Sequence, residues 1–219
     1  TTSESTGTFT TTTSWTHTPV GGGAAPEGVI VFIVVNNSVA DDCTTVTYGG
    51  TGMAEVALSP NISNQGEDSV TYGYFLGATV PTGAQTVAVT CTGTFTKKAY
   101  ATSVEATEGD MTVVDTTAAE GVTANPSDTL SLGGVVSYCA MGWFSGVANT
   151  GSVNPATDWN SSYELDEGSQ MVGMYTYSII ASSDVTFGLS QGNDEYNILG
   201  VCIREPAAAG GTRRIMVVN

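Results

Sequence analysis

The single histidine of this chain, His17, is the residue that nucleophilic or acid–base catalysis would require as its base. It lies in the strand-like run Ser14-Trp15-Thr16-His17-Thr18, and no Gly-x-Ser-x-Gly nucleophile elbow is expected to accompany it. One histidine with scattered cysteines also falls short of a zinc site. The sequence therefore favours a surface or structural role for His17 and predicts a protein that is not an enzyme, with no catalytic residue.

Paired carboxylates are the second candidate, because glycoside hydrolysis needs two acids that flank a sugar. The chain has 21 acidic residues, so adjacent pairs arise by chance: Asp41-Asp42, Glu67-Asp68, Asp166-Glu167 and Asp194-Glu195. All four fall in expected loops, where solvated surface charge is the favoured interpretation and loop-bound calcium is the alternative. No EF-hand or Asp-x-Asp-x-Asp pattern supports calcium, so we predict no metal site and no cofactor.

Cysteines and tryptophans have similar alternatives. Cys43, Cys91, Cys139 and Cys202 form no C-x-x-C pair, and three of them lie in strand-like runs. Burial as small apolar residues is the favoured interpretation, while one or two disulfides, in three connectivities, stay open. Trp15, Trp143 and Trp159 are suited to a sugar-stacking platform, but tryptophans in strands more often belong to the core.

Three Asn-x-Ser sequons are present, beginning at Asn36, Asn61 and Asn160. Such triplets occur readily by chance in a chain rich in Asn, Ser and Thr. They matter only if the host glycosylates.

The charge balance excludes several partners. The formal net charge is −16, and the five cations are Lys97, Lys98, Arg204, Arg213 and Arg214. Five cations cannot offset the repulsion between 21 carboxylates and phosphate, which argues against nucleic acid and anionic membranes as partners. The longest apolar run, residues 29–35, is shorter than the roughly 20 residues of a membrane span. No signal peptide is visible, so a processed secreted chain and a protein released by lysis both stay open.

The elements that must position these residues are short strands. Thr, Val, Gly and Ser dominate, helix formers are scarce, and no sustained 3.6-residue stripe occurs. We expect strands at residues 9–18, 29–35, 44–48, 53–58, 70–76, 86–92, 99–105, 111–116, 129–132, 135–144, 171–180, 185–189 and 197–204.

Three stretches are expected to be irregular or turning. Residues 120–127 are a predicted loop, 149–168 are the longest irregular stretch, and Gly49-Gly50-Thr51-Gly52 is a predicted tight hairpin. The second half has the same kind of short strands between turns as the first half, and no linker separates the two halves. The predicted fold class is all-β, a single antiparallel β-sandwich of jelly-roll type.

The predicted organisation is one sandwich domain, 1–204, whose residues 1–14 are a Thr/Ser-rich lead. Residues 205–219 follow as an Ala/Gly spacer and a C-terminal arm. The arm carries the candidate assembly contacts, which are Arg213, Arg214, Ile215, Met216, Val217 and Val218. Two cations next to four apolar residues are unusual in this chain. Docking on a neighbouring subunit and folding back as a last strand both remain open, with fraying as a third alternative.

Several runs carry a resemblance, in chain order: Ser14-Trp15-Thr16-His17-Thr18-Pro19, Gly28-Val29-Ile30-Val31-Phe32, Val46-Thr47-Tyr48-Gly49-Gly50-Thr51-Gly52-Met53, Tyr72-Gly73-Tyr74-Phe75-Leu76, Pro81-Thr82-Gly83-Ala84-Gln85-Thr86-Val87 and Gly200-Val201-Cys202-Ile203-Arg204-Glu205. Together they resemble a family of β-sandwich, jelly-roll-like virion structural proteins of tailed phages, of the capsid decoration type. Residues 106–168 match this pattern poorly. The resemblance carries over no catalytic residue.

The resemblance implies a non-enzymatic capsid decoration (cement) or head-surface protein on the virion exterior. Its partners would be the major capsid protein or other virion subunits, and a homo-oligomer is expected. The alternative is a carbohydrate-binding or adhesin module, of a tail fibre or a secreted bacterial protein, that takes a host surface glycan. A glycan-acting enzyme is the third hypothesis.

Overall fold

Among the residues that the computed structural model describes, there are eighteen strands and no helix. These residues are 2–4, 9–19, 28–36, 43–93, 95–106, 110–134, 136–147, 159–166, 170–177, 183–205 and 215–216. Every strand pairing is antiparallel. The predicted fold class, an all-β antiparallel sandwich, is confirmed.

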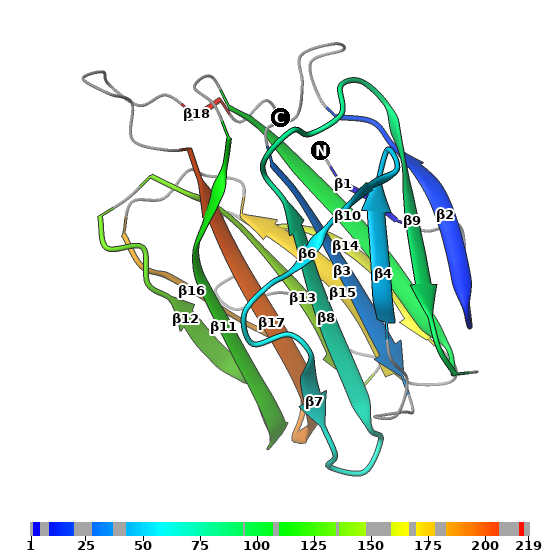
Figure 1. Ribbon diagram of the computed structural model, residues 1–219. Coiled ribbons are helices and arrows are strands. Elements are labelled where there is room, and N and C mark those ends of the chain that lie inside the picture. The colour runs from blue at the N-terminus through cyan, green and yellow to red at the C-terminus, as the bar shows by residue number, and fades with distance from the viewer. Residues whose placement is uncertain are drawn as a thin grey trace.

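The first half of the chain builds two sheets (Figure 1). The N-inner sheet has the order β1-β10-β3-β8-β6, with β7 also on β8 and β18 on β10. Its strands are β1 (Thr2–Glu4), β3 (Gly28–Asn36), β6 (Ala54–Glu55), β7 (Asn61–Ser63), β8 (Ser69–Leu76), β10 (Lys97–Ala106) and β18 (Ile215–Met216). The N-outer sheet has the order β2-β9-β4-β5, from β2 (Thr12–His17), β4 (Cys43–Tyr48), β5 (Thr51–Gly52) and β9 (Gln85–Cys91).

The second half builds two more sheets. The C-inner sheet has the order β11-β17-β13-β15-β14, from β11 (Thr112–Thr123), β13 (Tyr138–Ser145), β14 (Trp159–Asp166), β15 (Gln170–Tyr177) and β17 (Asp194–Arg204). The C-outer sheet is the pair β12 (Ser127–Leu130) and β16 (Val185–Gly188).

The four sheets stack as layers, with the central strands of both inner sheets, β3, β8, β13 and β17, buried on both faces. On β3, Val31 and Ile33 face the N-outer sheet, while Ile30 and Phe32 join the core shared with the C-inner sheet. A third core lies between the C-inner and C-outer sheets and contains Trp143. Figure 1 shows the outer sheets at opposite sides of the molecule. The two inner sheets are therefore the predicted sandwich, and the outer sheets cover its two remaining faces.

The two halves, 2–106 and 111–205, share one topology. In the inner sheets β1, β10, β3 and β8 occupy the places that β11, β17, β13 and β15 occupy in the second half, and β6 with β7 corresponds to β14. In the outer sheets the pair β2–β9 corresponds to β12–β16. The correspondence keeps chain order throughout, and only β4 and β5 lack a described counterpart. The similar succession of short strands and turns in the two halves of the sequence therefore corresponds to a repeated strand order in the structure.

The pattern of apolar residues predicted the burial of two strands correctly. All nine residues of β3 are buried, as expected for a strand covered on both faces. Val70, Tyr72, Tyr74 and Leu76 belong to one core layer, as their alternation on β8 predicted.

Two local predictions were wrong. Residues 120–123 continue β11 instead of forming a loop, and 159–166 form β14 instead of irregular chain. Both strands lie at the edges of the C-inner sheet, and the half-exposed side chains of β11 lack the alternation that marks a half-buried strand. The predicted tight hairpin is present, because β5 pairs with β4 across Gly49 and Gly50. After it, β6 crosses to the N-inner sheet.

Two glycines let aromatic rings approach the inner strands. A Cβ on Gly142 of β13 would lie 2.7 Å from the ring of Phe32, and one on Gly200 of β17 would lie 2.6 Å from Phe187. These positions accept no larger side chain without moving a buried ring.

Candidate functional site

The candidate assembly contacts are only partly placed. Ile215 and Met216 form β18, whose backbone pairs with Ala106 and Glu105 at the end of β10. Arg213, Arg214, Val217 and Val218 lie outside the described residues. Two residues of the arm thus fold back onto their own chain, and docking on a neighbour stays a prediction. The domain boundaries at 204 and 205 also stay predictions.

His17 is a buried structural residue. Its Nε2 lies 2.7 Å from Ser103 Oγ, which joins β2 to β10 by a hydrogen bond whose direction depends on the imidazole tautomer. The ring of Tyr48 meets the imidazole edge-on, with centroids 6.2 Å apart. Burial lowers the pKa of His17 to about 4. A serine and a histidine are therefore in contact, but inside a packed core.

We expect this burial to make folding sensitive to acid. The unfolded chain binds a proton at His17 below about pH 6.5, whereas the folded chain does so only near pH 4, so stability is lost as the pH falls through this window. The loss at pH 4 is about 3 kcal/mol relative to pH 7. Urea unfolding at both pH values, for the wild type and His17→Gln, measures it. The variant shares the carboxylate titrations, so a difference between the two proteins that does not change with pH would contradict the assignment.

Contrary to the expectation for His17, a Gly-x-Ser-x-Gly pattern does occur in the chain, far from this histidine, at Gly188–Gly192. A nucleophile elbow requires a strand, a sharp turn and a helix. Here the pattern joins β16 of the C-outer sheet to β17 of the C-inner sheet, and the histidine contacts Ser103, not Ser190. Gly188 is needed for another reason, since a Cβ there would lie 2.1 Å from the carbonyl oxygen of Pro126. Packing therefore explains the first glycine of the pattern.

Two of the acidic pairs meet in space. Glu195 Oε2 accepts a 2.7 Å hydrogen bond from the backbone N–H of Glu67, and Gln170 Nε2 donates to Glu67 Oε2. A Cβ on Gly146 would lie 2.8 Å from Asp194 Oδ1 and 3.0 Å from Glu67 Oε2, so these oxygens converge on one point. Burial, with Asp194 and Glu195 nearby, raises the pKa of Glu67.

The expectation of solvated loop charge was wrong for Asp194-Glu195. These residues begin β17, and Glu195 is 1% exposed because its carboxylate holds the loop before β8. Its Oε1 has no hydrogen-bond partner in the described part of the chain. Among the same residues, no group of three or more His, Cys, Asp or Glu side chains is arranged to hold a metal ion. The cluster therefore acts as a junction between the halves.

A reciprocal asparagine pair lies close by. Asn61 Nδ2 donates to Asn197 Oδ1 at 3.0 Å and to the carbonyl of Ile198 at 2.9 Å, while Asn197 Nδ2 donates to the carbonyl of Asn61 at 2.9 Å. This asparagine clasp joins β7 to β17. A glycan on Asn61 would break it, and Asn36 is 1% exposed. Two of the three sequons are thus built into the fold.

Replacing Asn197 with alanine should lower the free energy of unfolding by about 2–3 kcal/mol. The side chain is fully buried, and the change removes the clasp hydrogen bonds, each with a net value of about 1 kcal/mol. The exposed Asn193 gives a matched control, since Asn193→Ala should change stability by less than about 0.5 kcal/mol. Urea unfolding compares the two, and equal effects would argue against the clasp.

All four cysteines are disulfide-bonded, as Cys43–Cys91 and Cys139–Cys202. The expected burial is confirmed, but the favoured interpretation as free cysteines was wrong. Each disulfide joins directly opposed residues of neighbouring strands, β4 with β9 and β13 with β17. Strand pairing decides which cysteines meet, and spacing along the sequence does not report it.

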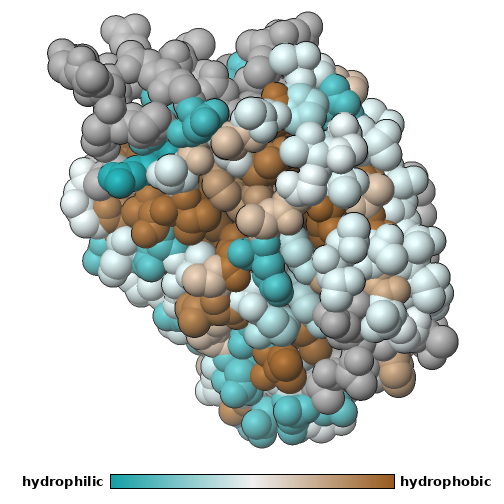
Figure 2. Space-filling model, in the orientation of Figure 1, coloured by the Kyte–Doolittle hydropathy of each residue, from teal (hydrophilic) through white to brown (hydrophobic). Residues whose placement is uncertain are grey.

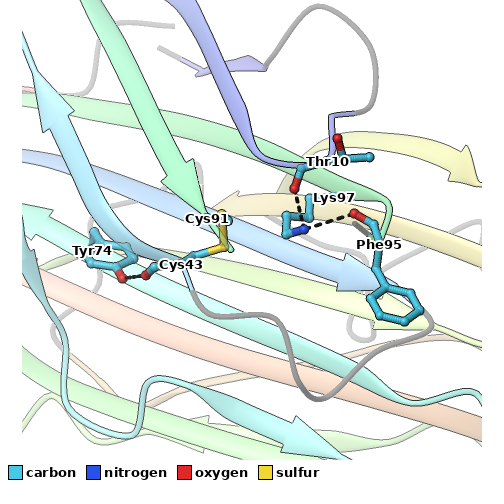
Figure 3. The surroundings of a disulfide bond; sticks show 6 residues. All are labelled: Thr10, Cys43, Tyr74, Cys91, Phe95 and Lys97. Atoms are coloured by element: carbon cyan, nitrogen blue, oxygen red, sulfur yellow. Dashed lines mark hydrogen bonds between the residues drawn. A yellow bond between two sulfur atoms is a disulfide. The ribbon is translucent and has the colours of Figure 1, made fainter. Parts of the chain in front are cut away.

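Figure 3 shows the surroundings of the first disulfide. The hydroxyl of Tyr74 donates to the carbonyl of Cys43. Nearby, the ammonium of Lys97 donates to the carbonyls of Thr10 and Phe95 at 2.5 and 3.0 Å. Lys97 and Lys98 are 1% and 3% exposed, so two of the five cations lie inside the protein.

Two of the three tryptophans considered for a sugar-stacking platform are buried and cannot contact a sugar. Trp15 and Trp143 are buried in the outer core layers, as the core interpretation predicted. The side chain of Trp159 lies outside the part of the protein that the structure describes.

Comparisons with known proteins give little beyond this geometry. No family model matches the chain, and no curated protein matches it. Among solved structures, a plant receptor-like kinase, ANX2, shows 8% identity and a TM-score of 0.30, over 90% of this chain and 81% of that one. The STIV MCP, a viral major capsid protein, shows 10% identity and a TM-score of 0.28, over 95% of this chain and 98% of that one. Similarity at this level is weak. No helix in the described part of the chain is long and apolar enough to cross a membrane.

Proposed function

We propose that this chain is a non-enzymatic structural protein of a virus particle, most simply a capsid decoration or head-surface subunit. Its partners would be the major capsid protein and further copies of itself, and its place would be the particle exterior. A secreted, extracellular protein is the alternative location. The family resemblance of the sequence supports this assignment.

The observation that carries the proposal is that side chains capable of chemistry are used to build the fold. His17 is held by Ser103, Glu195 binds a backbone amide, and Lys97 is buried against carbonyls. The cysteines are crosslinks. Such a molecule is a framework, and its outward surfaces are what it offers to partners.

The disulfides also agree with a location on a virus particle or outside the cell. Disulfides form and persist in oxidising surroundings, including virion surfaces and secreted proteins, and are rare in reducing cytosol. Crosslinks in both halves suit a protein that outlasts the cell in which it was made.

Quantitative mass spectrometry of purified particles tests the proposal. A copy number in the hundreds is expected for a decoration subunit. A few copies would move the protein to the tail, and absence from particles would overturn the proposal.

Deleting residues 206–219 tests the arm separately. If the arm binds a neighbour, the shortened protein should fold with an unchanged melting temperature and fail to enter particles. A sharp drop in melting temperature would instead assign the segment to its own domain. Unchanged melting with normal incorporation would exclude both roles.

A further inference from the structure

The outward face of the N-outer sheet has an unusual composition. Its outward positions, here called the threonine face, are Thr12, Ser14, Thr16, Thr45, Thr47, Gly52, Thr86, Ala88 and Thr90. Seven of the nine positions are exposed, and Thr47 and Ala88 are half-buried. Not one of these positions is charged, although the chain carries 21 acidic residues.

The register arranges these side chains in rows across neighbouring strands. Thr12, Thr90 and Thr45 form one row, and Ser14, Ala88 and Thr47 form the next. Strands in a sheet lie about 4.8 Å apart, and outward residues recur about every 6.6 Å along a strand. The result is a regular array of hydroxyl and methyl groups. Figure 2 shows it as the pale area over the side where Figure 1 places β4 and β9.

The opposite side of the same sheet fixes this array. Trp15, Tyr48 and Val87 point into the core between the N-outer and N-inner sheets. Because side chains alternate between the two faces of a strand, the neighbours of these residues point outward. Because threonine is β-branched and stiff at χ1, a threonine array loses little side-chain entropy when another surface covers it.

The chemistry of the face favours a second copy of this chain. A hydroxyl both donates and accepts, so an array of hydroxyls is complementary to itself under a two-fold axis. The bond between Thr129 Oγ1 and Thr186 Oγ1, 3.1 Å long on the C-outer sheet, shows such pairing within the molecule. Two chains of charge −16 repel each other, and a surface free of carboxylates is where they can approach most closely.

A glycan fits the face less well. Sugar platforms use exposed aromatic rings, and the aromatic residues of these strands, Trp15 and Tyr48, are both turned inward.

We propose that the threonine face packs against the threonine face of a second copy of this chain. The inference names a self-association surface for the proposed virion protein. It rests on the proposed function only in assuming that the protein is part of a virus particle. There, a weak contact repeated by symmetry becomes a strong one. Since the long-range force between the copies is repulsive, association should strengthen as salt screens it.

Sedimentation equilibrium of the purified full chain tests the proposal, at up to about 1 mM protein and physiological salt. The wild type should form a dimer. Ala88→Asp, which places like charges face to face at the centre of the array, should weaken association at least tenfold. Val122→Asp adds the same charge at a position that is 48% exposed on β11, and it should associate as the wild type does.

Two further variants guard against misfolding. Ser14→Asp changes an exposed neighbour of Ala88 and should act in the same direction, whereas Ala88→Thr should keep the dimer. A wild type that stays monomeric throughout, or equal loss from Val122→Asp, would overturn the proposal. Absence of the protein from particles would overturn the proposed function and leave the dimer measurement standing.

Discussion

Replacing Phe32 with alanine should lower the free energy of unfolding by about 3–5 kcal/mol, the range for large buried aromatic side chains. The ring is fully buried on β3, in the core layer that joins the two halves. The missing Cβ of Gly142 makes room for it, so position 142 has no side chain that could extend into the space that the ring would leave. The cavity should remain, and its cost adds to the lost burial.

Phe95→Ala is the matched control, because this phenylalanine is 43% exposed in the connection between β9 and β10. Its loss should cost less than about 1 kcal/mol. Urea unfolding in parallel gives the two values. Similar losses for both variants would contradict the placement of Phe32 between the halves.

Replacing both Cys139 and Cys202 with alanine should lower the free energy of unfolding by about 4 kcal/mol. The disulfide closes a segment with a sequence separation of 63, and the chain-entropy relation gives this value for a loop of that length. Both residues are fully buried, so packing loss adds to the effect.

The pair Cys43 and Cys91 provides the comparison, with a separation of 48 residues. The relation depends only on the logarithm of length, so its removal should cost nearly the same. Unfolding without reductant measures both double variants. The wild-type protein, unfolded without reductant, should also resist alkylation by iodoacetamide, and ready labelling would show that its cysteines are free.

The internal resemblance of the halves bears on how the protein is held together. One face of each inner sheet packs against the other half, and the clasp of Asn61 and Asn197 and the carboxylate junction at Glu195 both cross this boundary. Variants at the boundary should therefore destabilise both halves together.

The fold class could be predicted from the sequence because strand periodicity is local. The uninterrupted apolar run of β3 showed a strand buried on both faces, and the alternation of β9 showed which side chains point inward. Composition and charge likewise needed no structure to argue against nucleic acid as a partner.

The tertiary structure decided everything that depends on which strands become neighbours. His17 meets Ser103, Glu67 meets Glu195, and Asn61 meets Asn197 across 86, 128 and 136 residues of chain. Neither these contacts nor the cysteine pairs leave a signal in spacing, because sheet order and register are set by packing over the whole chain. Residue type and alternation determined that a threonine points outward, and only the register of β2, β9 and β4 gathered those threonines into one uncharged face.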